Sequence, residues 1–259
     1  MRRFGGITKL YGTSGLERLR RAHVCVIGIG GVGSWSAEAI ARHGVGHITL
    51  IDLDMVAESN TNRQIHALGD VYGKAKVDAM AERIHAINPE CTIHCIEDFV
   101  TPENVSTLLT ESFSVVIDAI DQIKAKAAIA DHCRRQKIPL IIAGAAGGQS
   151  DPTRIRVADL SKTEQDPILS KLRSILRKQY GFPRDGKKFG MTAVYSTEPL
   201  RYPEPSDHCT IPAQGPQGLN CAGFGSSICV TSVFGMVAAS QAVEQITHNK
   251  EFAEANFAC

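Results

Sequence analysis

The sequence predicts an α/β protein with a doubly wound, Rossmann-like and mostly parallel sheet. Three observations lead to this prediction: short apolar runs alternate with helical patterns in the first half of the chain, a glycine-rich turn follows the first run, and an aspartate ends the second. The runs lack alternating polarity, which is typical of strands buried on both faces. Ligands bind such sheets at the carboxyl ends of the strands, so the functional residues are expected there.

The first half of the chain contains the clearest expected elements. Strands are expected at residues 22–28, 47–52, 91–99, 113–121 and 137–144. Helices are expected at residues 34–44, 73–89 and 101–109, with one more before the last of these strands. In the helix at 101–109, Thr101 would cap the N-terminus and Pro102 would take the first helical position.

The second half is less regular. We expect a strand at residues 153–160 and a helix at 166–181, which Asp166 would cap. Residues 182–225 are rich in Pro and Gly and show no sustained periodicity, so they predict a loop. A long final helix is expected at residues 226–247.

Composition limits the possible classes of protein. The chain has 259 residues, of which 43% are hydrophobic, so it can bury a full core and is not expected to be disordered. A formal net charge of +1 identifies no partner. The N-terminus lacks an apolar segment of signal-peptide length, and the apolar run at 228–240 is too short to span a membrane, so we expect a cytoplasmic protein that is not integral to a membrane. Its eight scattered cysteines are expected to be reduced thiols.

A nucleotide site is expected around the glycine turn "GIGGVG" and the strand end "LIDLD". The turn would let the backbone approach a phosphate, and the aspartate would accept hydrogen bonds from ribose hydroxyls. Both features suit NAD as well as ATP. The candidate residues here are Gly28, Gly30, Gly31, Gly33, Asp52 and Asp54.

The residues that follow favour ATP over NAD. A dehydrogenase needs few cations in this loop, whereas attack at an α-phosphate develops charge that Arg, Lys and magnesium can neutralise. Taken alone, Arg63 and Lys76 are as well explained as surface charges and Asp121 as a helix cap, but the set together favours a triphosphate. Asp121, at the end of the fourth strand, is placed to hold Mg²⁺. The further candidates are Asn60, Arg63, Gln64 and Lys76.

The pattern "GIGGVG…LIDLDMVAESNTNRQ…GKAKVD…DAID" resembles the adenylating domain shared by ubiquitin-activating enzymes and the bacterial activators of the molybdopterin and thiamine sulfur carriers. The resemblance implies one adenylating domain over residues 1–259, with a nucleotide-binding half at 1–150 and a half at 151–259 that faces tRNA and a second subunit. It implies a homodimer with the last helix near the interface. It also implies a ribose contact for Asp52, phosphate contacts for Asn60, Arg63, Gln64 and Lys76, and magnesium for Asp121, with Arg63, Lys76 and Asp121 acting in catalysis.

Two departures from the sulfur-carrier activators are visible. Those relatives hold a structural zinc with two Cys-x-x-Cys pairs, and this sequence has no such pair, so no zinc is expected. They also carry an N-terminal arginine that reaches the partner's site. Gly6 stands near that position here, which leaves Arg3 as the candidate substitute.

Longer stretches, including "RFGGITKLYG", "GAAGGQSDPTRIRV" and "STEPLRYP", resemble one branch of this superfamily, the dehydratases of threonylcarbamoyladenosine in tRNA, also described as sulfur acceptors for a cysteine desulfurase. The resemblance implies ATP-dependent activation of the threonyl carboxylate, followed by ring closure. It also implies a monovalent cation, K⁺ or Na⁺, in the "NCAGFGS" loop. An activator of a ubiquitin-like sulfur carrier, and a sulfur relay between a desulfurase and its acceptor protein, remain as alternatives.

Cys221 is the candidate for covalent chemistry. It lies just before the final helix, whose amides and dipole could lower the pKa of its thiol. It also matches the position of a cysteine proposed in relatives to accept sulfur or to act as a nucleophile. A small loop residue without chemistry is the alternative. Cys209 is a weaker second candidate.

A basic segment is the candidate tRNA surface. Apolar residues at helical spacing face inward, which leaves the basic side chains of the helix at 166–181 facing water. Such a face would contact phosphates without reading sequence. An ordinary solvated helix face is the alternative. The basic residues are Lys171, Arg173, Arg177, Lys178, Arg184, Lys187 and Lys188.

Overall fold

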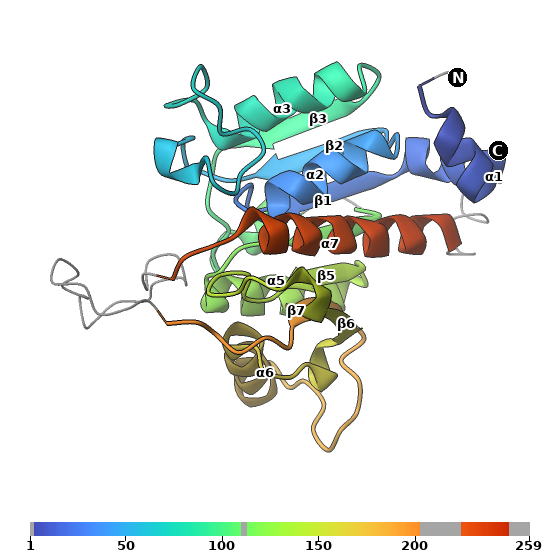
Figure 1. The fold of residues 1–259 in the computed structure, drawn as a ribbon. Coiled ribbons are helices and arrows are strands. Elements are labelled where there is room, and N and C mark those ends of the chain that lie inside the picture. The colour runs from blue at the N-terminus through green and yellow to red at the C-terminus, as the bar shows by residue number, and fades with distance from the viewer. Residues whose placement is uncertain (1–2, 110–112, 203–223, 249–259) are drawn as a thin grey trace, which may run out of the picture.

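A computed structural model describes residues 3–109, 113–202 and 224–248, in which seven strands form one sheet in the order β3-β2-β1-β4-β5-β7-β6 (Figure 1). Neighbouring strands are parallel except β6 and β7. The predicted fold class is therefore confirmed. The strands are β1 His23–Ile27, β2 His47–Ile51, β3 Thr92–Ile96, β4 Val115–Asp118, β5 Leu140–Ala143, β6 Ile155–Asp159 and β7 Thr192–Ser196.

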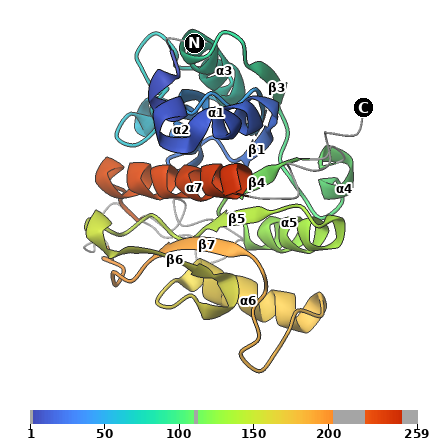
Figure 2. The same ribbon diagram turned by 90° about the vertical axis from the view of Figure 1, so that its right-hand side faces the viewer.

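Helices cover both faces of the sheet (Figure 2). One apolar cluster joins the sheet to α1, α2, α3 and α7, and a second joins its other face to α4, α5 and α6. Within the described ranges, three short 3₁₀ helices lie at Glu58–Asn60, Pro152–Arg154 and Leu160–Lys162. The helices are α1 Gly5–Arg21, α2 Gly33–Arg42, α3 Lys76–Ile87, α4 Val105–Leu108, α5 Ile123–Gln136, α6 Pro167–Gln179 and α7 Ile228–His248.

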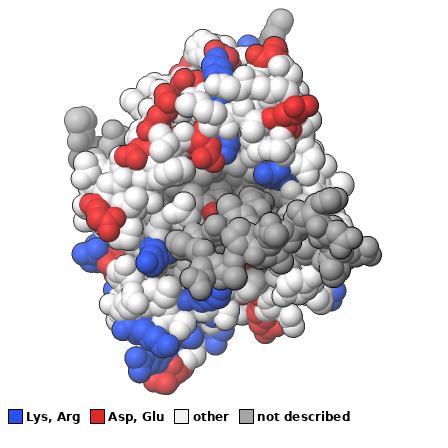
Figure 3. Space-filling view, turned by 90° about the vertical axis from the view of Figure 1, so that its left-hand side faces the viewer, with Lys and Arg blue, Asp and Glu red and all other residues white. Residues whose placement is uncertain are grey.

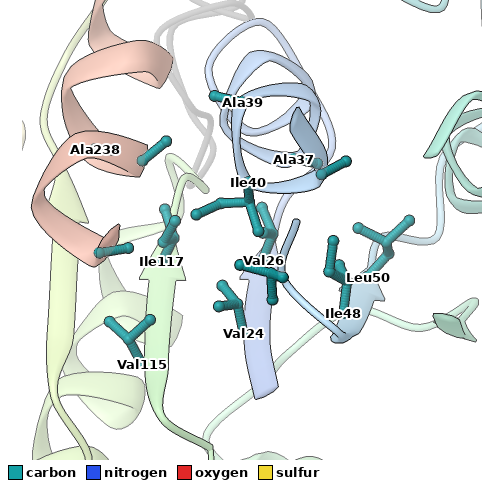
Figure 4. Packing of buried hydrophobic residues seen from close by; sticks show 14 of the residues in the cluster. Val24, Val26, Ala37, Ala39, Ile40, Ile48, Leu50, Val115, Ile117 and Ala238 are labelled. Carbon is teal, nitrogen blue, oxygen red and sulfur yellow. The ribbon is translucent and has the colours of Figure 1, made fainter. Parts of the chain in front are cut away.

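The two clusters show why the central strands are apolar at most positions. Val24 and Val26 of β1 point toward Ile40 of α2, as Figure 4 shows, while the intervening Cys25 belongs to the cluster on the opposite face. Helix α7 packs closely against α2 because Gly235 has no side chain: a Cβ there would lie 2.5 Å from Val32 O. The last helix is therefore part of the same core as α1, α2 and α3.

The structure corrects two expectations and adds one helix that no pattern predicted. Strand β7 lies inside the segment 182–225 that was predicted to be a loop, and it pairs with β5 and β6. The helix expected at 101–109 begins only at Val105, because Thr101 accepts the amides of Glu103 and Asn104 in a preceding turn. Helix α1 was not expected. Among the described residues, no helix is long and apolar enough to cross a membrane.

Candidate nucleotide-binding site

A cavity of about 460 Å³ opens at the carboxyl ends of the central strands. Its walls come from the segments that follow β1, β2, β3, β4 and β5, together with the start of α7. Figure 3 views the molecule from this side and shows the hollow beside the grey residues. The cavity brings together ten residues singled out from the sequence: Gly28, Gly30, Gly31, Asp52, Asp54, Asn60, Arg63, Gln64, Lys76 and Asp121.

The glycine turn is shaped by close backbone contacts. Gly28 has φ +84°, a conformation that side chains disfavour. Gly33 is the one candidate glycine that does not line the cavity. A Cβ at Gly33 would lie 1.8 Å from Gly28 O, so this glycine lets α2 begin directly against the turn. Gly30 and Gly31 remain at the cavity wall, where a phosphate can approach the backbone.

Asp52 is held by backbone amides at the end of β2. Its Oδ2 accepts Ile29 N at 2.6 Å, and its Oδ1 accepts Asp54 N at 2.9 Å. Burial raises the pKa of this carboxyl, while the charge of Lys76 and the two amides act in the opposite direction. The amides orient the carboxylate toward the glycine turn, and each oxygen has a second lone pair with which to accept a hydroxyl.

Lys76 is the first residue of α3 and is buried. Its Nζ donates to Asp54 Oδ2 at 2.6 Å, and its amide donates to Asp54 O at 3.0 Å. Met55 and Ala75 form an antiparallel bridge beside this pair, so the intervening loop returns to the cavity. Asp54 is half exposed, which makes it a partner that a phosphate could displace from the ammonium group.

A 3₁₀ turn presents the remaining polar residues. Asn60 Oδ1 accepts Ala57 N at 3.0 Å, which holds the turn together. The Arg63 side chain packs along Gly31, and its Nη1 donates to Ser59 O at 2.8 Å. Burial lowers the pKa of Arg63. Gln64 is buried, and its Oε1 has no hydrogen-bond partner within the described ranges, so one acceptor beside the cavity is left unpaired.

Asp121 lies in the loop after β4. The sequence did not predict the buried ion pair next to this loop, between Lys126 and Asp118. Lys126 Nζ donates to Asp118 Oδ1 at 2.9 Å, and both side chains are fully buried. Asp166 caps α6 through Leu169 N at 2.8 Å and also accepts Ala145 N from the cavity wall at 2.7 Å. Lys126 on the inward face of an alanine-rich helix was the available signal for this buried pair.

Comparison with known proteins places the chain in a family. A model described as the ThiF family matches residues 6–258. The chain belongs to the ThiF family. It is 50% identical to the tRNA threonylcarbamoyladenosine dehydratase of Haemophilus influenzae, over 96% of this chain and 94% of the relative. It is 52% identical to the Escherichia coli K12 protein of the same name, over 94% of this chain and 93% of the relative.

Solved structures resemble this ThiF-family chain over nearly its full length. The crystal structure of the E. coli tRNA N6-threonylcarbamoyladenosine dehydratase in complex with ATP has a TM-score of 0.85 at 50% identity, covering 95% of this chain and 93% of that one. The same enzyme in complex with AMP also has a TM-score of 0.85 at 50% identity, covering 95% and 94%. These neighbours confirm the expected branch of the superfamily.

The basic segment of the ThiF-family chain lies outside the cavity. Blue side chains gather at the lower end of Figure 3, at the level of α6 in Figure 1. Five of the seven predicted basic residues are exposed, namely Lys171, Lys178, Arg184, Lys187 and Lys188.

Two residues of this segment differ from the expectation that all of its basic side chains face water. Arg173 and Arg177 are only partly exposed. Arg173 Nη1 donates to Thr163 Oγ1, and the Arg177 guanidinium lies 5.2 Å from the centre of the Phe189 ring. Burial, with the nearby charge of Arg177, lowers the pKa of Arg173. These two arginines therefore also hold α6 to its surroundings.

The remaining predicted features of the ThiF-family chain are two cysteines, the "NCAGFGS" loop and Arg3. Cys209 and Cys221 lie outside the described residues, as does most of the "NCAGFGS" loop. Arg3 Nη1 donates to Ile87 O at 2.8 Å, at the opposite end of α3 from Lys76. Arg3 therefore binds the C-terminus of this helix and does not reach the cavity of its own chain.

Proposed function

We propose that this chain is an ATP-dependent dehydratase that converts threonylcarbamoyladenosine beside the anticodon of tRNA to its cyclic form. The observation that carries the proposal is the cavity itself, where Asp52, Arg63, Lys76 and Asp121 line one space at the carboxyl edge of the sheet. The relatives named for this activity match nearly the whole chain, and one of them has been solved with ATP and with AMP.

The chemistry requires activation because a carboxylate oxygen is a poor leaving group. An oxygen of the threonyl carboxylate attacks the α-phosphorus of ATP, an acyl adenylate forms, and pyrophosphate leaves. A nitrogen of the same side chain then attacks the acyl carbon, loses its proton, and expels AMP with the former carboxylate oxygen. Ring closure is intramolecular, and proximity contributes up to about 7–11 kcal/mol in favourable cases.

The cavity residues suit these steps. Asp52 accepts hydrogen bonds from the ribose, and the backbone at Gly30 and Gly31 approaches the phosphates. Lys76 exchanges its contact with Asp54 for a phosphate oxygen, and Arg63 neutralises charge that develops in the transition state.

Magnesium is expected beside Asp121. The carboxylates of Asp121 and Asp54 line the same cavity, and carboxylate oxygens are the ligands that Mg²⁺ prefers. Bound there with ATP, the ion would neutralise phosphate charge. We also propose a homodimer through α7, which the resemblance to the superfamily implies, and the exposed side chains of Ile228 and Met236 on this helix support it.

Mass measurement of the nucleoside tests the proposal. The protein is incubated with ATP, Mg²⁺ and tRNA that contains threonylcarbamoyladenosine. The tRNA is then digested to nucleosides, and the mass of the modified nucleoside is measured. Loss of one water is expected with the wild type, and a strong reduction is expected with Lys76→Ala. Lys74→Ala is the matched control, because Lys74 lies two residues away, is partly exposed, and pairs with Glu82. Pyrophosphate exchange that depends on a carrier protein ending in Gly-Gly, without nucleoside conversion, would contradict the proposal.

A further inference from the structure

Two segments that are distant in sequence meet on either side of Gly148. Gly148 N donates to Gly225 O at 2.7 Å, and Arg201 N donates to Gly148 O at 2.7 Å. The preceding residue, Gly147, lines the nucleotide cavity, and a Cβ there would lie 3.7 Å from Phe224 Cβ. Residues 201–202 and 224–225 are therefore held beside the cavity wall.

These segments place an aromatic pair next to the cavity. The ring centroids of Tyr202 and Phe224 are 5.2 Å apart, with the planes tilted by 55°. The Phe224 ring packs against the backbone of Gly148, since a Cβ at Gly148 would lie 2.9 Å from Phe224 Cδ1. Tyr202 is 77% exposed, more than any other large hydrophobic side chain among the described residues. Phe224 thus supports Tyr202 from one side, and most of the tyrosine remains open to solvent.

The residue before Tyr202 in the chain is a cation, Arg201. The Arg201 side chain is 70% exposed, and its Nε lies 3.4 Å from Glu198 Oε1. Glu198 is itself buried and fixed, because its carboxylate accepts Ser150 N at 3.0 Å and Asp151 N at 2.8 Å. Proteins bind single-stranded nucleic acid with exposed aromatic rings that stack on bases and with basic side chains that contact the backbone, and Tyr202 and Arg201 supply one of each from adjacent positions.

We infer that Tyr202, supported by Phe224, is a stacking platform for an anticodon-loop base next to the reacting nucleoside. The inference rests on the proposed tRNA substrate. A nucleoside that enters the cavity must leave the stack of its loop, and its neighbour then loses a stacking partner. Tyr202 replaces that partner at the cavity wall, while the exposed lysines near α6 bind phosphates farther away.

Equilibrium binding of an anticodon stem-loop RNA that carries threonylcarbamoyladenosine tests this inference. Tyr202→Ala is expected to weaken RNA binding by roughly 5- to 100-fold, the effect of losing one stacked base, and Tyr202→Phe should retain the affinity. The slope of log Kd against log salt should stay unchanged, because no phosphate contact is lost. Leu10→Ala is the matched control, since Leu10 is 73% exposed on α1, at the other end of the molecule (Figure 1).

A fluorescent variant reports stacking directly. The chain has one tryptophan, Trp35, so Tyr202→Trp adds a single new fluorophore whose signal is obtained by subtracting the wild-type spectrum. Saturating RNA should quench this signal. Wild-type affinity in Tyr202→Ala, or an unquenched signal from the introduced indole at saturation, would overturn the inference. Failure of the proposed function is recognised separately, because the wild type would then bind RNA without removing water from its nucleoside.

Discussion

Lys126 Nζ lies 2.9 Å from Asp118 Oδ1, and neither side chain has any exposed surface. Asp118 Oδ1 also accepts Ile120 N at 3.2 Å, and Ile120 and Asp121 both line the cavity. Burial raises the pKa of Asp118, and the adjacent ammonium of Lys126 opposes that shift. The ion pair therefore lies directly behind the loop that presents Asp121, and it holds this loop from inside the core.

Breaking this pair is expected to destabilise the protein. Lys126→Met leaves Asp118 buried without its partner, which should lower the free energy of unfolding by about 3–5 kcal/mol. Denaturant melts measure the change. Lys124→Met is the control, since Lys124 is exposed on the same helix. The double variant Asp118→Asn, Lys126→Met should recover part of the loss, and a single variant as stable as the wild type would contradict this role.

Two glycines of the same turn should respond differently to alanine. Gly33→Ala places a Cβ against Gly28 O, so the helix must move and the melting temperature should fall. A Cβ at Gly30 would have only Gln64 Nε2 within 4 Å, at 3.9 Å, so the fold should tolerate Gly30→Ala. ATP binding should weaken in this variant, because the added methyl group enters the cavity. Thermal melts and ATP titrations separate the effects. Equal stability of the two variants would refute this account of Gly33.

His66 makes stability depend on pH. It is buried, and neither ring nitrogen has a hydrogen-bond partner in the part of the chain that the structure describes. Burial, followed by the charges of Lys76 and Arg83, lowers its pKa from 6.5 to about 4. The unfolded chain therefore binds the proton more tightly, and stability is lost as the pH falls from 6.5 toward 4. Through this histidine alone, the free energy of unfolding should fall by about 2 kcal/mol between pH 7.5 and pH 5.

Urea melts at pH 7.5 and pH 5 test the contribution of His66. His66→Leu should flatten the dependence on pH, because it removes the group whose pKa differs between the folded and unfolded states. His85→Leu is the control, since His85 is exposed on α3. An unchanged pH dependence in His66→Leu would show that other groups titrate in this range.

The exposed lysines near α6 should govern the salt dependence of tRNA binding. Lys187→Glu with Lys188→Glu is expected to weaken binding and to reduce the slope of log Kd against log salt by roughly 2, while ATP affinity is retained. Filter binding at several salt concentrations measures both quantities. Arg177→Glu, unlike the lysine variant, should also lower the melting temperature, because Arg177 packs over Phe189. An unchanged slope in the double lysine variant would exclude this surface.

Local patterns in the sequence predicted much of the structure of residues 1–150. Apolar runs predicted β1, β2 and β4, and the glycine spacing with Asp52 predicted the turn that the cavity contains. Asp166 was recognised as a cap of α6, and its side chain does accept Leu169 N. These predictions succeeded because strand burial, helix capping and glycine turns depend on residues a few positions apart.

Contacts between remote segments decided the rest. Strand β7 forms because β5 and β6 offer it partners on both sides, and no periodicity in its five residues reveals that pairing. The second hydrogen bond of Asp166, to Ala145 N, joins the first turn of α6 to the cavity wall. The pairing of Lys126 with Asp118 and the burial of His66 likewise exist only in the folded chain. The sequence by itself singled out ten residues that line one cavity, whereas tertiary packing decided which charges lie behind them, because desolvation and long-range pairing arise only when distant segments meet.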